Sequence, residues 1–162
     1  SIWKLESGQT NLKKINEGLP FAGNVLGVLR VGPDDTLYIA YNDFNPGSST
    51  YNYGVYSSNN AGETWTPILK GLPQHDAGMI SYTDLKISER DNSLYLSVAG
   101  VRDTGQEGVY KFASGNTSWK KITMEGLPAN NDVFVGLAVD PLLGLHVSVG
   151  LDGVYAQVPT EN

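Results

Sequence analysis

Short runs in which apolar and polar residues alternate recur along the chain. The first full set covers residues 25–31, 37–41, 53–58 and 64–69. Alternation with a period of two places every second side chain on one face of an extended segment, so each run is expected to form a half-buried strand. No long stretch shows the 3.6-residue period of an amphipathic helix. The pattern therefore predicts an all-β protein.

The same four-run pattern returns further along the chain, separated by residues typical of turns. Pro33-Asp34-Asp35 and residues 89–92 supply the turns between the first two runs of each set, through the fixed φ of proline and side-chain bonding by Asp and Asn. The remaining strands are expected at residues 2–5 and 12–15, at 83–88, 94–98, 108–112 and 118–123, and at 136–140, 145–149 and 153–158.

Two sequence landmarks show that these sets are internal repeats. Gly18-Leu19-Pro20 returns at Gly71 and Gly126, at spacings of 53 and 55 residues. Gly54-Val55-Tyr56 returns at Gly108 and Gly153 in the same phase. Independent landmarks with one period indicate a repeat architecture in which each repeat is one structural unit.

Four short strands in every fifty-odd residues predict a β-propeller built of four-stranded antiparallel blades, about three blades in this chain. The period alone would also suit a β-solenoid. On the propeller interpretation the chain is a single segment that consists of a half blade (residues 1–20), two blades (21–73 and 74–128) and an incomplete blade (129–162).

One turn carries a specific family resemblance. The stretch from Ser58 to Trp65 includes Asn60, Gly62 and Thr64, and it resembles the Asp-box of the sialidase-like (BNR) repeats, with Asn60 where Asp is usual. Residues 114–119 resemble a shortened copy, and residues 7–12 a copy without its tryptophan. The resemblance implies a propeller and a structural role for the box, away from the ligand-binding face. Asn60 is expected to bond backbone N–H groups, and Trp65 to pack between sheets.

The resemblance also limits the activities to be expected. The blades are similar to those of the secreted xyloglucanases, which implies an extracellular location. A complete sialidase would need an arginine triad, whereas this chain has only Arg30, Arg90 and Arg102, the first inside an apolar strand. In the xyloglucanase family the catalytic cleft lies between two propellers, so a three-blade chain would hold half of it.

Charge and composition exclude several partners and sites. Lys and Arg number 11 against 17 for Asp and Glu, which gives a net charge of −6 and argues against nucleic acid or an anionic membrane as partner. The absence of cysteine excludes disulfides and thiol chemistry. The only histidines, His75 and His146, are too far apart in sequence to suggest a metal site, and no cofactor is expected.

In propellers of this family, ligands meet the face formed by two sets of loops: those that join successive blades and those that join the second and third strands of a blade. These loops carry aromatic, amide and carboxylate groups that suit sugar hydroxyls and ring faces. The candidate ligand-binding residues are Asp43, Phe44, Tyr51, His75, Asp76, Arg102, Asp103 and Asp132.

The sequence therefore predicts an extracellular, non-catalytic, glycan-binding propeller module. Two alternatives stay open: part of a glycoside hydrolase of the xyloglucanase kind, which needs paired carboxylates at a cleft, and a propeller that binds proteins. Ordinary turn-forming roles for the aspartates also remain possible.

Three blades are too few to close a ring, since propellers have four to eight. We therefore expect a homodimer that forms a six-bladed ring, a partner chain that completes the propeller, or a longer protein from which this segment comes.

Overall fold

The computed structural model describes residues 1–20, 24–45, 50–73, 80–100, 105–124, 134–142, 144–150 and 153–156. In these residues every regular element is a β-strand, and all strand pairs are antiparallel, which confirms the all-β prediction.

The strands form four sheets in chain order. The first sheet contains β1 (Trp3–Leu5) and β2 (Leu12–Lys14). The second contains β3 (Asn24–Val31), β4 (Leu37–Asn45), β5 (Thr50–Ser58) and β6 (Thr66–Pro67). The third contains β7 (Ile80–Ile87), β8 (Leu94–Gly100), β9 (Gly108–Phe112) and β10 (Lys120–Lys121). The fourth contains β11 (Phe134–Asp140), β12 (Gly144–Val149) and β13 (Gly153–Ala156).

Most strands lie where the alternation predicts them, with two differences. β4 extends to Asn45 and β5 starts at Thr50, so Asp43, Phe44 and Tyr51, which were expected in a loop, lie in strands. The strands expected at 64–69 and 118–123 pair over only two residues each, as β6 and β10. The cause is visible at the tryptophans before them, because the backbone N–H of Trp65 donates to Glu17 O and that of Trp119 to Lys70 O, both in the preceding repeat. These residues bond to the neighbouring sheet, so the ladder of their own sheet begins only afterwards.

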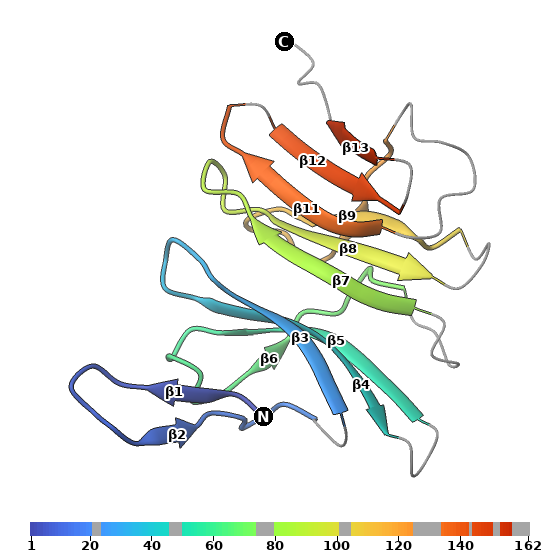
Figure 1. Ribbon diagram of the computed structural model, residues 1–162. Helices are drawn as coiled ribbons and strands as arrows, with labels where there is room; N and C mark the ends of the chain where they lie inside the picture. Colours follow the sequence, from blue (N-terminus) through green and yellow to red (C-terminus); the bar gives the residue numbers. More distant parts are fainter. Residues whose placement is uncertain are drawn as a thin grey trace.

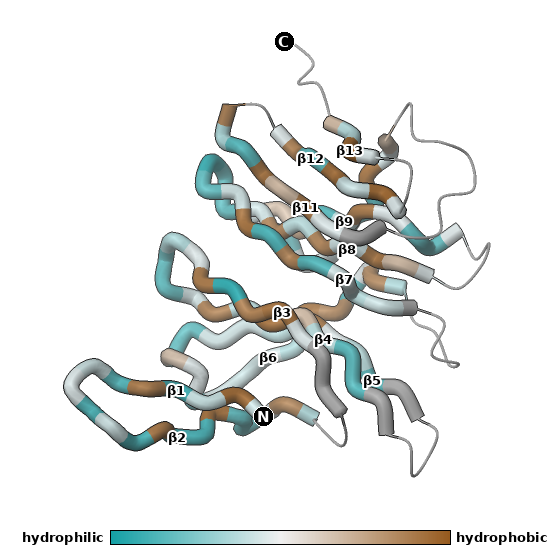
Figure 2. The backbone as a smooth tube through the Cα atoms, in the orientation of Figure 1, coloured by the Kyte–Doolittle hydropathy of each residue, from teal (hydrophilic) through white to brown (hydrophobic). Residues whose placement is uncertain are grey.

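The four sheets follow one another in a stack, with their faces turned toward each other (Figure 1). Brown and teal segments alternate along the strands, as expected for strands with two different faces (Figure 2). The largest cluster of buried side chains joins the second and third sheets and includes Val55, Leu96 and Trp119. A second cluster joins Val109 of the third sheet to Leu137 and Val147 of the fourth. The core is therefore divided among the contacts between sheets.

The first strands of successive sheets lie side by side, since β3 contacts β7, and β7 contacts β11. Because each sheet is a simple antiparallel meander, its strand ends alternate between two ends of the stack. Asn24 pairs with Phe44, Ile80 with Gly100 and Phe134 with Val149. The starts of β3, β7 and β11 and the ends of β4, β8 and β12 therefore share one end, which we call the loop end. We call the opposite end the turn end.

Aspartate side chains shape the turns between the first and second strands, as the sequence predicts. Asp34 accepts a hydrogen bond from the backbone N–H of Thr36, and Asp91 accepts one from that of Ser93. The N–H of Leu142 donates to the carboxylate of Asp140 in the same way. Bonds of this kind, to a backbone group two residues ahead, hold a turn in place of a backbone pair.

The Gly-Leu-Pro landmark marks a close approach between consecutive sheets. Gly18 and Gly71 both have φ near +87°. A Cβ on Gly18 would lie 2.6 Å from the carbonyl oxygen of Trp65, and one on Gly71 would meet the corresponding oxygen of Trp119. Only glycine adopts this backbone conformation freely and leaves this space, so the repeat of the glycine follows from the repeat of the contact.

Candidate functional site

The turn from Ser58 to Trp65 has a dense network of internal hydrogen bonds. The hydroxyl of Ser58 donates to the side-chain oxygen of Asn60 over 2.8 Å and accepts from the N–H of Gly62 over 2.9 Å. The same Asn60 oxygen accepts from the N–H of Thr64 over 3.0 Å, while its amide nitrogen donates to the Thr64 hydroxyl. The Asn60 side chain thus accepts one backbone hydrogen bond, from the Thr64 N–H, as the sequence leads us to expect.

Trp65 connects this turn to the preceding sheet. Its ring is 4% exposed, and its indole N–H donates to Ile15 O over 2.9 Å. Trp119 repeats the arrangement one sheet later, with its indole N–H on Ile68 O at 2.7 Å. Both side chains are held between sheets, so their geometry suits a packing role.

Three of the candidate ligand-binding residues, Asp43, Phe44 and Tyr51, lie in β4 and β5 near the loop end. Phe44 and Tyr51 are directly opposite each other in the register of β4 and β5. Asp43 is 1% exposed, so its carboxylate lies beneath the surface. His75 and Asp76 precede β7, Arg102 and Asp103 join β8 to β9, and Asp132 precedes β11, and all five lie outside the described residues.

Near the loop end, a partly buried amide links the second and third sheets. Asn42 of β4 donates through its side chain to Tyr82 O over 2.8 Å and accepts from the Tyr82 N–H over 2.9 Å. The ring of Tyr53 meets that of Tyr82 edge to face, with centroids 5.5 Å apart. Burial, and then the neighbouring tyrosines, raise the pKa of Tyr82 well above its usual value, so the hydroxyl stays neutral at physiological pH.

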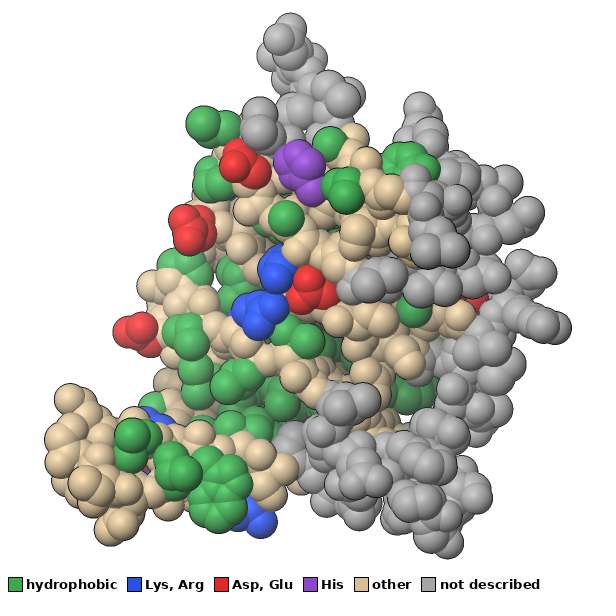
Figure 3. Space-filling model, in the orientation of Figure 1, with side chains coloured by type: hydrophobic (Ala, Val, Ile, Leu, Met, Phe, Trp, Pro, Cys, Tyr) green, Lys and Arg blue, Asp and Glu red, His purple; other side chains and the backbone are tan. Residues whose placement is uncertain are grey.

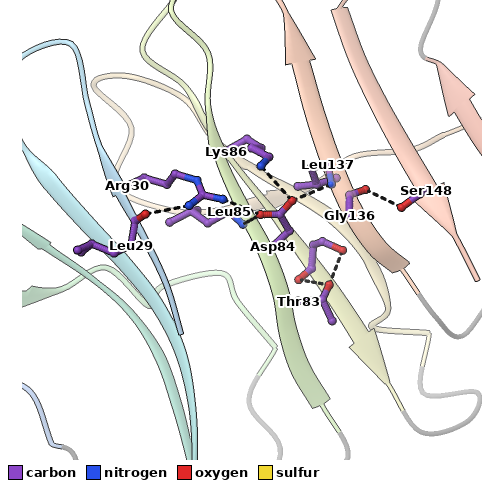
Figure 4. A network of polar contacts seen from close by, with 10 residues as sticks. Leu29, Arg30, Thr83, Asp84, Leu85, Lys86, Gly136, Leu137 and Ser148 are labelled. Atoms are coloured by element: carbon purple, nitrogen blue, oxygen red, sulfur yellow. Dashed lines mark hydrogen bonds and ion pairs between the residues drawn. The ribbon is translucent and has the colours of Figure 1, made fainter. Parts of the chain in front are cut away.

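A charged network links the first strands of three consecutive sheets (Figure 4). Asp84 of β7 accepts from the guanidinium of Arg30 in β3 over 3.2 Å and lies 3.3 Å from Lys86 Nζ. It also accepts from its neighbour Leu85 N–H over 2.8 Å and from Leu137 N–H, in β11, over 3.0 Å. The Asp84 side chain is 15% exposed. One carboxylate thus has four donors, two of them cationic, so its charge is well compensated.

A local irregularity of β7 accompanies this network. The pairing register of β7 and β8 shifts between Tyr82 and Asp84, and the intervening Thr83 hydroxyl lies 2.8 Å from that of Ser97. The register of β11 and β12 shifts at the corresponding place, between Phe134 and Gly136. A bulge leaves one residue unpaired and changes the direction of its neighbours.

A hollow of about 420 Å³ adjoins the network on the side of the turn end. Arg30 and Lys86 contribute its cations and Glu89 a carboxylate, and the rest of its lining is Val31, Gly32, Pro33 and Ile87. On the face that Figure 3 shows, charged side chains of both signs gather near the middle, over the first strands. Charges of both signs next to apolar atoms suit a polar, hydroxylated ligand better than a purely apolar one.

The sequence reasoning missed this network. It placed Arg30 in an apolar strand and did not single out Asp84 or Lys86. The available signal was a departure from the repeat, because the position of Asp84 is Val28 in the second sheet and Gly136 in the fourth, by alignment of the strand registers. A buried carboxylate at a position that is apolar or glycine elsewhere needs partners, and those come from the neighbouring sheets.

In the part of the chain that the structure describes, no group of three or more His, Asp or Glu side chains is placed to hold a metal ion. The same part contains no helix of the length and hydropathy that crossing a membrane requires. Comparison of the chain with protein-family models, with curated proteins and with solved structures gives no match.

Proposed function

We propose that the chain is part of a β-propeller in which each sheet is a blade, and that it binds glycan without catalysis at the loop end, outside the cell. The box-like turn from Ser58 to Trp65 supports the propeller, because it recurs in outline with its interblade tryptophan at Trp119.

One observation carries the binding proposal: the segments that hold the candidate residues all start or finish at the same end of the stack. The strand registers place the end of β4, the end of β8 and the starts of β7 and β11 together there. Loops that converge from several sheets are the usual place for a ligand site on a rigid β scaffold.

The β4–β5 ribbon gives this end its most distinctive chemistry. Pairing continues from Leu37 and Ser58 without interruption to Asn45 and Thr50, farther than the pairing of β8 and β9, which ends at Val98 and Gly108. The far part of the ribbon holds Asn42, Asp43, Phe44, Tyr51 and Asn52. Aromatic rings stack on the apolar faces of sugars, and amides bond their hydroxyls.

A glycan array, followed by titration calorimetry on the best hit, tests the proposal. Wild-type protein should bind a restricted set of sugars. Removal of one aromatic ring, in Phe44→Ala or Tyr51→Ala, should weaken binding about tenfold, on the order of 1.4 kcal/mol.

The matched control is Asn116→Ala, an exposed residue in the turn between β9 and β10 at the turn end. It should bind as wild type does. An array blank at high protein concentration, or equal losses in all three variants, would contradict glycan binding at the loop end. Release of reducing sugar from xyloglucan would instead support the hydrolase alternative.

A further inference from the structure

At the turn end of the third sheet, a lysine lies between a carboxylate and an aromatic ring. Lys111 Nζ, from β9, lies 3.1 Å from one carboxylate oxygen of Asp91 and over the ring of Tyr95, 5.3 Å from its centre. The other oxygen of Asp91 accepts the N–H of Ser93, which fixes the carboxylate in its turn. A carboxylate and an aromatic ring side by side form a site for an ammonium group.

The second sheet repeats the ring but not the lysine. In the register of β8 and β9, Tyr95 lies opposite Lys111. In the register of β4 and β5, Tyr38 lies at the corresponding place, opposite Ser57. The position of the lysine is therefore held by a short side chain in the second sheet.

The carboxylate is repeated as well. Asp34 accepts the backbone N–H of Thr36 over 3.2 Å, the same bond by which Asp91 holds its turn. Asp34 lies beside Tyr38, since a Cβ on Gly32 would be 2.8 Å from the Asp34 carboxylate and 3.2 Å from the Tyr38 ring. Among the residues that the structure describes, no cationic side chain pairs with Asp34.

The space that the lysine chain fills in the third sheet is open in the second. A hollow of about 360 Å³ lies there, and its lining consists of hydroxyl and amide side chains, from Thr36, Ser57, Ser58, Asn59, Thr64 and Thr66. We call it the hydroxyl hollow. It adjoins the carboxylate and the ring, because Thr36 is bonded to Asp34 and Ser57 pairs with Tyr38. Thr66, like Ser57, has a lysine as its counterpart in the third sheet, so short side chains account for the space.

A cation next to Tyr38 does not close this place to a second cation. Arg30 lies opposite Tyr38 in the register of β3 and β4, and its guanidinium bonds to Asp84 of the third sheet. Its counterpart is Lys86, which likewise lies 3.3 Å from Asp84. The third sheet accommodates Lys111 despite that neighbour, so the second sheet can accommodate an ammonium group in the same way.

We propose that the hydroxyl hollow binds an amino sugar, with its ammonium group against Asp34 and over the ring of Tyr38. The ammonium takes the place that Lys111 Nζ has in the third sheet. The hydroxyl lining favours a hydroxylated sugar ring over an alkyl chain, since both partners can then donate and accept hydrogen bonds. The hydroxyl hollow is at the turn end, so it does not depend on the glycan site proposed for the loop end. Because Asp34 is exposed, binding should be weak, with a Kd on the order of 1 mM.

An NMR titration at pH 6, where the sugar amine is protonated, tests the proposal with glucosamine oligomers as the probe. In the wild type, the backbone N–H signals of Thr36, Ser57, Asn59 and Thr64 should shift and saturate. N-acetylglucosamine oligomers of equal length have the hydroxyls but lack the ammonium group, and they should bind about tenfold more weakly or less. Equal affinity for the two sugars, or no shifts at the hydroxyl hollow, would overturn the proposal.

Two variants test the residues that form the site. Asp34→Asn keeps an acceptor for the Thr36 N–H but removes the charge, so affinity should fall by about tenfold or more. Ser57→Lys gives the second sheet the lysine of the third, whose own ammonium should occupy the site and abolish binding. The control Asp35→Asn removes the same charge from the adjacent residue and should change affinity by less than about threefold. Undiminished binding by folded Ser57→Lys, with folding checked by circular dichroism, would contradict the proposal.

Two further arms identify the place and the ligand. Phe44→Ala, at the loop end, should bind the glucosamine oligomers as the wild type does. A loss of affinity in that variant would show that the oligomers bind at the loop end and would overturn the proposal. A lysine-rich peptide that shifts the same signals at lower concentration than the oligomers would rule out the amino sugar as the preferred ligand.

Discussion

The stack of sheets is held together differently along its two sides. At the last strands, Trp65 and Trp119 insert between sheets and bond to Ile15 O and Ile68 O, with almost the same geometry each time. At the first strands, one residue, Asp84, bonds to Arg30 in one neighbouring sheet and to Leu137 in the other. We call these the tryptophan side and the aspartate side.

The difference between the two sides separates features that recur in the repeat from features that are specific to one sheet. The contact between the first and second sheets and that between the second and third sheets use the same residue type, so the tryptophan repeats in the sequence. Among the residues that the structure describes, the network of Asp84 occurs once, and it adjoins a hollow that is lined by Arg30 and Lys86. Departures from the repeat are therefore where this chain acquires properties that its architecture does not require.

The largest effect is expected on the tryptophan side. Trp119→Ala and Trp65→Ala should each lower the free energy of unfolding by about 3–5 kcal/mol, because each removes a large buried ring and leaves a cavity. Urea denaturation followed by circular dichroism measures this. Equal midpoints for Trp65→Ala and wild type would contradict the packing role that we assign to that turn.

A smaller loss is expected on the aspartate side. Asp84→Asn keeps the shape of the side chain but removes the charge that faces Arg30 and Lys86, so unfolding free energy should fall by about 1–3 kcal/mol. Asp34→Asn, which retains an acceptor for the Thr36 N–H, is the control and should change stability by less than about 0.5 kcal/mol. Similar losses in both variants would show that Asp84 is an ordinary polar residue of the strand.

The smallest effect on stability is expected at Asp91. Its turn in the third sheet corresponds to the Asp34 turn in the second sheet. Burial by itself raises the pKa of Asp91, but hydrogen bonds from Ser88, Lys111 and Ser93 hold that pKa well below its usual value. A lowered folded-state pKa stabilises the protein above the unfolded-state value near 4, and the gain is lost as the pH falls through the folded-state value. Asp91 is partly exposed, so Asp91→Asn should cost less than about 1 kcal/mol at pH 7. Thermal melts should show that the difference in stability between wild type and Asp91→Asn becomes smaller below pH 4. A difference that is constant from pH 7 to pH 2 would contradict the assignment.

Local rules were enough to predict most of the fold. Alternation fixed the strands, and the turn chemistry of Asp34, Asp91 and Asn60 acts within a few residues of each side chain. The short β6 and β10 were not predictable from alternation, because their pairing is limited by backbone bonds to another sheet.

The candidate site was harder to predict for the same reason. Asp43 looks like a loop carboxylate in the sequence, yet it is buried because β4 and β5 continue to pair beyond it. The partners of Asp84, Arg30 and Leu137, are 54 and 53 residues away in the sequence, so no local sequence pattern predicts these contacts. Only the comparison of equivalent repeat positions could have drawn attention to Asp84.

The central claim is that the repeated tryptophans hold consecutive sheets together, and the three indole N–H groups of this chain test it directly. Hydrogen exchange of these groups can be followed by NMR in the wild-type protein. The account predicts that Trp65 and Trp119, whose indole N–H groups are bonded between sheets, exchange only as fast as the protein unfolds, while the exposed Trp3 exchanges within the dead time. Rapid exchange at Trp65 or Trp119 in the folded protein would contradict the claim.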